Sequence, residues 1–158
     1  MACDATARLY DVDEKLVVFK RLNNSNKYDQ GEIVFRARKG ALVDLGKLHE
    51  SLWATRLSGG TRSGIVSLNV TSIGEVSRDD GTFVLHVSGT DARFVLKQHS
   101  ANEHAVAFRR LQTMAREGVT MRVSGVIDQY VGRWPTVLKT TPKGPRIIRV
   151  TKVEAESS

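Results

Sequence analysis

Hydrophobic and polar residues alternate with a period of two along most of the chain after residue 63, which predicts β-strands. The alternation indicates strands at 65–76, 82–88, 92–98, 119–129 and 146–153. Within the second of these segments, the pattern points Phe83, Leu85 and Val87 inward and Val84 and His86 outward. In the third, the inward positions are Phe94 and Leu96.

Turn and helix signals separate these strands. Asp80-Gly81 predicts a tight hairpin turn, because both residues tolerate positive φ. Apolar residues at helical spacing predict a helix over 102–117, and Ser100 with Glu103 forms the S-x-x-E pattern of a capping box. Gly125, inside the fourth strand, predicts a bulge or a sharp bend.

The first part of the chain shows a different pattern, with strands expected at about 15–20 and 31–38 and a helix at about 44–57. Asp44 is placed to cap this helix, whose apolar face would carry Leu45, Leu48 and Leu52. We therefore expect an α+β elaboration over 1–62, a barrel domain over 63–154, and a frayed tail over 155–158.

Three strands, a helix and two further strands form an order that resembles the OB fold of the nucleic-acid-binding, tRNA-anticodon-binding-like kind. The resemblance is carried by residues 74–76 leading into Asp80-Gly81, by 83–87, and by 123–127 followed by 130–133. It implies a mainly β fold with helices (α+β). Its core is a five-stranded OB-like barrel with a helix between strands 3 and 4, preceded by the β-β-α elaboration of 1–62. The elaboration itself resembles no family that we can name.

The charge of the chain bears on the class of partner that it could bind. The chain has 24 Lys and Arg against 17 Asp and Glu, a formal net charge of +7 and a pI of about 9.9. Residues 131–158 hold six of the basic residues and only two acidic ones. A localised basic segment favours phosphate-bearing partners, and it is equally typical of a solvated face that keeps a protein soluble.

The resemblance implies a ligand-binding surface on strands two and three and on the loops beside them. Carried onto this sequence, it includes His86 and Ser88 and predicts a nucleic-acid-binding set of Arg93, Lys97, Tyr130, Arg133, Trp134, Lys139, Lys143 and Arg146. Cations interleaved with aromatic rings suit single-stranded DNA or RNA. Because Phe83 and Phe94 are expected to point inward, the predicted strand face carries no stacking ring, which favours phosphate attraction over base stacking.

The sequence gives little support for a disulfide, a metal site, a catalytic site or a membrane segment. The single cysteine, Cys3, excludes an internal disulfide and a Cys-based zinc site, and His99 and His104 lack the flanking ligands of a metal site. No nucleophile motif is present, so we expect a protein that is not an enzyme and needs no cofactor. No membrane-length apolar segment or signal peptide is recognisable, which favours a cytoplasmic protein without a membrane partner.

Two alternatives remain open at this stage. The chain could act as a protein-protein adaptor or assembly module, using the barrel together with the apolar run at 16–19 and the amphipathic helix at 44–57. It could also bind a small molecule or an oligosaccharide, although few aromatic residues are expected on the outward strand face.

Overall fold

The computed structural model describes residues 18–22, 30–37, 41, 43–54, 64–65, 67–116, 118–131 and 141–156. The chain divides into two compact units, Met1–Ser63 and Gly64–Ser158, which we call unit 1 and unit 2.

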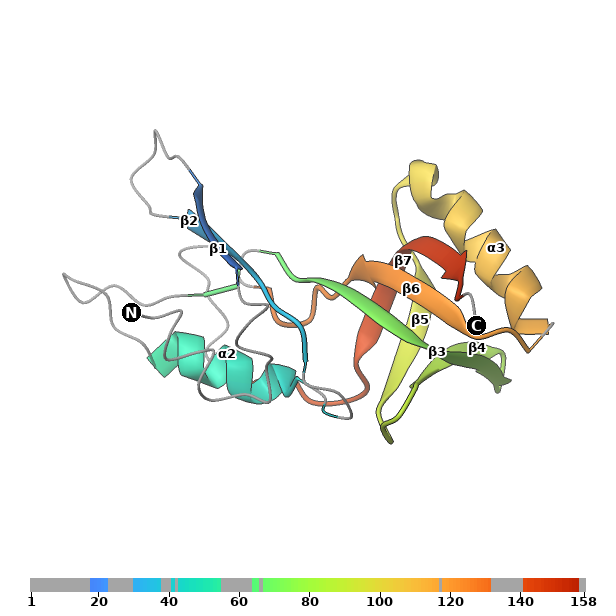
Figure 1. Ribbon diagram of the computed structural model, residues 1–158, viewed down its shortest axis with the longest axis horizontal. Helices are drawn as coiled ribbons and strands as arrows, with labels where there is room; N and C mark the ends of the chain where they lie inside the picture. The colour runs from blue at the N-terminus through green and yellow to red at the C-terminus, as the bar shows by residue number, and fades with distance from the viewer. Residues whose placement is uncertain are drawn as a thin grey trace. The chain divides into compact units, whose positions relative to one another are not determined.

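Unit 1 contains a hairpin and a helix (Figure 1). Strand β1 (Val18–Leu22) pairs antiparallel with β2 (Gln30–Val34), and helix α2 spans Leu45–Ala54. The side chain of Asp44 caps this helix, because its Oδ1 accepts a hydrogen bond from the Lys47 amide at 3.1 Å. Leu45 and Leu48 are buried, as their spacing predicted.

The expected strand and helix limits of unit 1 differ from those of the structure. Strand β2 ends at Val34, opposite Val18, rather than at residue 38. Strand β1 reaches Leu22 rather than residue 20, and the first part of the predicted strand, residues 15–17, lies outside the described residues. The predicted last turn of the helix, after Ala54, lies outside them as well.

Unit 2 is built on five strands that close into a barrel in the order β3-β4-β5-β7-β6 (Figure 1). Their bounds are β3 Asn69–Asp79, β4 Thr82–Val87, β5 Arg93–Gln98, β6 Met121–Val126 and β7 Ile147–Ala155. Strand β3 pairs with both β4 and β6, which closes the sheet. The pairing of β5 with β7 is parallel, and every other pairing is antiparallel.

The β3–β4 hairpin turns where the sequence predicted. Asp79 pairs with Thr82, and the two residues between them have positive φ, 45° for Asp80 and 80° for Gly81. Positive φ at both central positions matches the right-handed twist of the flanking strands. The predicted irregularity at Gly125 is also confirmed, because the β6–β7 register shifts between Ser124 and Gly125.

The helical segment between β5 and β6 begins differently from the prediction. A 3-10 turn, η2 (Asn102–His104), precedes helix α3 (Ala105–Arg116), and the residue that caps η2 is Ala101. No side-chain hydrogen bond caps that end, so the predicted capping box of Ser100 and Glu103 is wrong. The ring of His99 instead accepts a hydrogen bond from the Ala101 amide at 3.1 Å, which satisfies that backbone group just before the turn begins.

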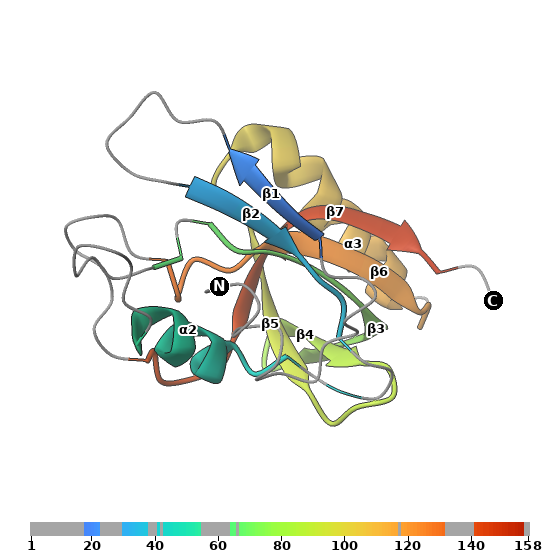
Figure 2. The same cartoon turned by 60° about the vertical axis from the view of Figure 1, so that its left-hand side comes forward.

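Helix α3 packs mainly against β7, as both views show (Figures 1 and 2). Leu111 and Met114 on its predicted apolar stripe are buried. The deepest side chains of unit 2 come from this helix, three of the strands and the segment after β6: Leu85, Leu111, Met121, Val123, Ile127, Ile148 and Val150.

The strands of unit 2 also begin and end away from their predicted limits. Strand β3 starts at Asn69 rather than at Ile65, which forms only an isolated bridge with Val131. Strand β7 continues to Ala155, a residue that the sequence analysis placed in the frayed tail, because Met121 of β6 pairs with it. None of the helices in the described part of the chain has the length and hydrophobicity that crossing a bilayer requires.

Candidate functional site

The outward-pointing side chains of β3, β4, β5 and β7 fall into three rows, because the strand register sets them opposite one another. The first row consists of Glu75, His86 and Arg93. The second consists of Ser77, Val84, Val95 and Ile147, and the third of Lys97 and Arg149. We call these nine residues the outward rows. The inward neighbours, such as Leu85 and Phe94, are buried. None of the nine is Phe, Tyr or Trp, in agreement with the expected lack of a stacking ring on this face.

Two predicted site residues, Arg93 and Lys97, lie on this face. Both are exposed on β5, and four residues along a strand span about 13 Å, with both side chains on the same side. Lys97 is the register partner of Arg149 on β7, so those two cations stand on adjacent strands about 5 Å apart in the backbone. The structure therefore gathers three cations where the sequence analysis placed two.

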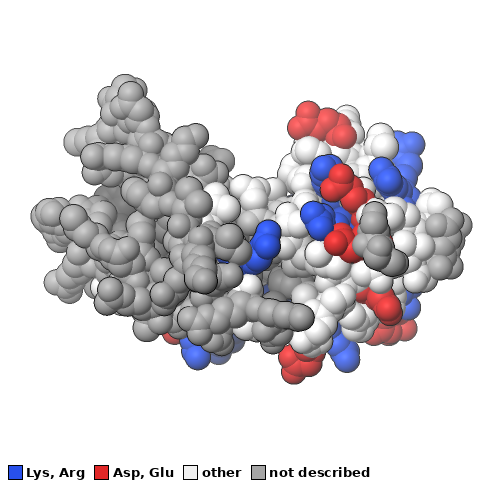
Figure 3. Space-filling view, in the orientation of Figure 1, with Lys and Arg blue, Asp and Glu red and all other residues white. Residues whose placement is uncertain are grey.

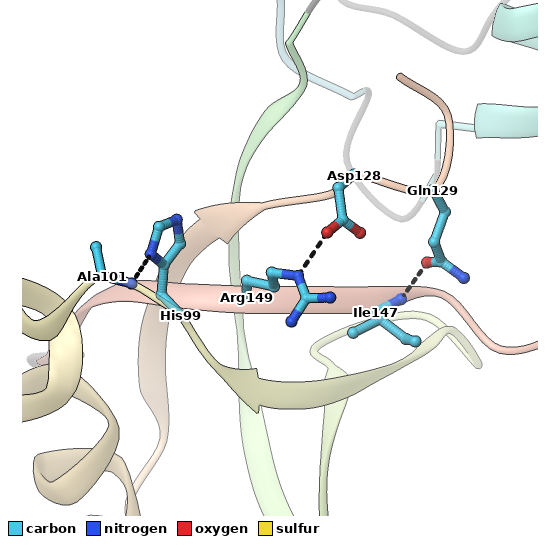
Figure 4. A network of polar contacts seen from close by, with 6 residues as sticks. All are labelled: His99, Ala101, Asp128, Gln129, Ile147 and Arg149. Atoms are coloured by element: carbon cyan, nitrogen blue, oxygen red, sulfur yellow. Dashed lines mark hydrogen bonds and ion pairs between the residues drawn. The ribbon is translucent and has the colours of Figure 1, made fainter. Parts of the chain in front are cut away.

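Arg149 is held in place by an acidic residue from the segment after β6. Its Nε lies 2.5 Å from Oδ2 of Asp128, and both side chains are partly exposed (Figure 4). This ion pair orients the guanidinium and cancels part of its charge. Sequence reasoning missed Arg149 as a site residue, because only the parallel pairing of β5 with β7 brings it beside Lys97.

The side chain of Gln129 ties together the two ends of the loop between β6 and β7. Its Oε1 accepts a hydrogen bond from the Ile147 amide at 2.7 Å (Figure 4). Its Nε2 donates a second one to the Pro145 carbonyl at 2.9 Å. The base of the loop is thus fixed beside the first residue of β7. The sequence offers no signal for this contact.

The predicted residues of that loop have different surroundings. Tyr130 is only 6% exposed, so its ring belongs to the interior and offers little surface for a base. Lys143 is exposed, and Arg146 is half-buried with its carbonyl accepting the Val95 amide at 2.8 Å. Arg133, Trp134 and Lys139 lie outside the described residues.

A groove of about 630 Å³ opens beside Lys97, between the β3–β4 hairpin, the end of β5, β7 and helix α3. Its lining consists of Arg78, Gly81, Thr82, Phe83, Leu96, Lys97, Gln98, Phe108, Gln112 and Arg149. The rings of Phe83 and Phe108 meet edge to face, with centroids 5.9 Å apart and planes at 89°. The guanidinium carbon of Arg78 lies 5.7 Å from the centroid of the Phe83 ring.

Sequence reasoning also missed this groove. Phe83 follows the same inward alternation as Phe94, yet Phe94 is buried while Phe83 is only half-buried. Phe83 lies one pair from the hairpin turn, next to the Asp79–Thr82 pair, where the end of the barrel leaves its ring accessible. A period-two pattern gives the direction of a side chain but not its depth along the barrel.

The histidines make local contacts. Ser77 Oγ and His86 Nε2 share a hydrogen bond of 2.8 Å on the outward rows. The rings of His99 and His104 lie 4.7 Å apart, and Nε2 of His104 is 3.3 Å from Glu103. Within the described ranges, no group of three or more His, Cys, Asp or Glu residues could hold a metal ion.

Acidic neighbours offset part of the basic charge in the C-terminal segment. Lys152 pairs with Glu154 at 2.9 Å, and that hydrogen bond and charge lower the pKa of the Glu154 carboxyl. Across the sheet, the hydrogen bond and charge of Glu156 raise the pKa of Arg122. On the part of unit 2 that Figure 3 shows in colour, basic and acidic residues are interspersed. Over the described residues 141–156, the excess positive charge is therefore not a uniform basic patch.

Comparison with protein-family models, with curated proteins and with solved structures finds no match to this chain.

Proposed function

We propose that unit 2 is an OB-like barrel that binds single-stranded nucleic acid, without catalysis, along the outward side of β5 and β7. The order of three strands, a helix and two strands supports this proposal, as does the closure of the five strands into one sheet. Both are features that the resemblance to OB domains implies.

The observation that carries the proposal is the grouping of Arg93, Lys97 and Arg149 on one face. Two strands that are distant in the sequence contribute these cations, and the β5–β7 register brings them together. A single strand that crosses β5 and β7 would place successive phosphates against them. Lys143 and Arg146 at the end of the neighbouring loop extend the same interface. The other predicted residues of that loop, Arg133, Trp134 and Lys139, lie outside the described residues.

The apolar row on the same face would contact the rest of the strand. Val84, Val95 and Ile147 are half-buried and register with one another across β4, β5 and β7. Sugars and base edges can pack on such a row, but without a ring it supplies no stacking platform. Affinity would therefore come mainly from phosphate contacts, with a marked salt dependence and little sequence preference.

The adaptor alternative has weaker support from the structure. One of the two features that motivated it, helix α2, buries Leu45 and Leu48, so these two residues of the predicted apolar face are not free for a partner. The other feature, the apolar run at 16–19, lies partly outside the described residues. We therefore propose nucleic-acid binding alone.

Removing two cations from the site tests this proposal. We expect the double variant Arg93→Gln/Lys97→Gln to bind a single-stranded oligonucleotide more weakly and to reduce the slope of log K against log salt by about 1.4, since each phosphate contact contributes about 0.7. Fluorescence anisotropy across a salt series measures both quantities.

The matched control is Arg110→Gln/Lys152→Gln, which removes the same charge from positions outside the outward rows and the groove. Its salt slope should equal that of the wild type. If both double variants lost the same affinity and the same slope, binding would depend on overall charge, and the proposed site would be wrong.

A further inference from the structure

We propose that the groove between the β3–β4 hairpin, β5, β7 and α3 binds one nucleoside monophosphate, either a free nucleotide or the terminal nucleotide of a strand. The inference extends the proposed function and rests on it in one respect, because Lys97 and Arg149 belong to both surfaces. The outward rows offer cations without aromatic rings, whereas the groove offers both.

The charge of the groove favours an anion. Arg78, Lys97 and Arg149 line it from three different strands, and no Asp or Glu is among its lining residues. Arg149 is partly neutralised by Asp128, which leaves Lys97 and Arg78 as the main attraction for a phosphate. A volume of about 630 Å³ lies within the ordinary range for small-ligand sites and is enough for one nucleotide.

The rings supply a place for a base. Phe108 stands perpendicular to Phe83, and the guanidinium of Arg78 lies over the Phe83 ring. Bases stack both on aromatic rings and on the planes of arginine guanidinium groups, so a base can lie on Arg78 or against an exposed ring edge. Phe83 and Phe108 are both half-buried, which leaves part of each ring within reach of a ligand.

Two side-chain amides add hydrogen-bond donors and acceptors to the groove. Gln98 at the end of β5 and Gln112 on α3 both line the groove. Each amide carries a donor and an acceptor, which is the combination that reads the edge of a base. A flexible acidic peptide would satisfy the cations but would make no use of the rings or of these amides. The lining therefore favours a nucleotide over an acidic peptide.

Calorimetric titration of the full chain at low salt tests the inference with three probes: adenosine monophosphate, adenosine and ribose 5-phosphate. We expect the nucleotide to bind about tenfold more tightly than either fragment, because only the nucleotide engages the cations and the rings together. Equal binding of all three probes, or equal competition by a polyglutamate peptide, would overturn the inference.

Two variants localise the binding. Lys97→Gln and Phe108→Leu should each weaken nucleotide binding about tenfold, whereas Lys152→Gln should leave it unchanged. Lys97 is exposed, so its variant tests the site even if Phe108→Leu lowers the melting temperature. Retention of full nucleotide affinity in Lys97→Gln would contradict the assignment.

A separate measurement distinguishes the two proposals and the two sources of the ligand. If an oligonucleotide binds and the mononucleotide does not, the groove inference is wrong while the proposed function stands. If the mononucleotide binds and oligonucleotides do not, the groove inference stands while the proposed function fails. When both bind, a preference for a 5′-phosphorylated over an unphosphorylated oligonucleotide identifies a strand end as the ligand, and equal affinity identifies a free nucleotide.

Discussion

Gly74 is the residue at which β3 passes from one ladder to another. Residues before it pair with β6, residues after it pair with β4, and Gly74 itself is opposite both Met121 and Val87. A Cβ on Gly74 would lie 1.9 Å from the His86 carbonyl oxygen, which is backbone and cannot move aside. The missing side chain therefore allows β3 to belong to both ladders, and so allows the sheet to close.

Substitution of this glycine gives the first prediction at the residue scale. We expect Gly74→Ala to reduce the free energy of unfolding by about 3 kcal/mol or more, because the backbone of β4 must move. Gly81→Ala is the comparison: its Cβ would meet nothing within 4 Å, but its φ of 80° costs about 1 kcal/mol. Urea unfolding of both variants measures the difference, and a loss at Gly74 no larger than that at Gly81 would contradict this account.

At the scale of elements, periodicity and turn chemistry predicted which elements form and in what order. The Asp80-Gly81 turn, the bulge at Gly125 and the cap at Asp44 each depend on residues close in sequence, and all three are present. The ends of strands depend on partners instead. Alternation alone extends β3 back to Ile65, but the ladder with β6 begins only at Asn69, opposite Val126.

The candidate site likewise contains residues that a local pattern predicts and residues that only a pairing between distant segments brings there. Arg93 and Lys97 could be predicted because they share one face of one strand. Arg149 joins them through a parallel pairing between segments far apart in sequence, which no local pattern indicates. Tyr130 was predicted as a nucleic-acid-binding residue, but the fold buries it at 6% exposure. The sequence thus predicted the charge on β5 but could not predict the groove beside it.

The connection between β6 and β7 gives a prediction at the scale of elements. Gln129→Ala removes both side-chain hydrogen bonds at the base of the loop and should reduce the free energy of unfolding by about 1–3 kcal/mol, while the Ile147 amide exchanges faster with solvent. Hydrogen exchange followed by NMR measures that amide directly.

The conservative control is Gln129→Glu, which keeps an oxygen for the Ile147 amide but loses the donor to the Pro145 carbonyl. Protection of Ile147 should largely survive in this variant. If Gln129→Ala left the exchange of Ile147 unchanged, the side chain would not hold the loop.

At the scale of the whole molecule, the net charge of +7 overstates the charge that a ligand meets. Arg149, Lys152 and Arg122 are each paired with an acidic residue, and the coloured part of Figure 3 mixes both signs. The proposed interface therefore relies on a few positioned cations, from Arg93, Lys97 and Arg149 to Lys143 and Arg146. Three to five phosphate contacts with a single strand correspond to a slope of log K against log salt between about −2 and −3.5.

The most direct test of the central claim is the affinity of the wild-type chain for single-stranded DNA, single-stranded RNA and duplex DNA across a salt series. Our account predicts that a single strand binds more tightly than the duplex, with a slope between about −2 and −3.5. No binding at low salt, a slope near zero, or tighter binding of the duplex would contradict the claim that unit 2 binds single strands through these cations.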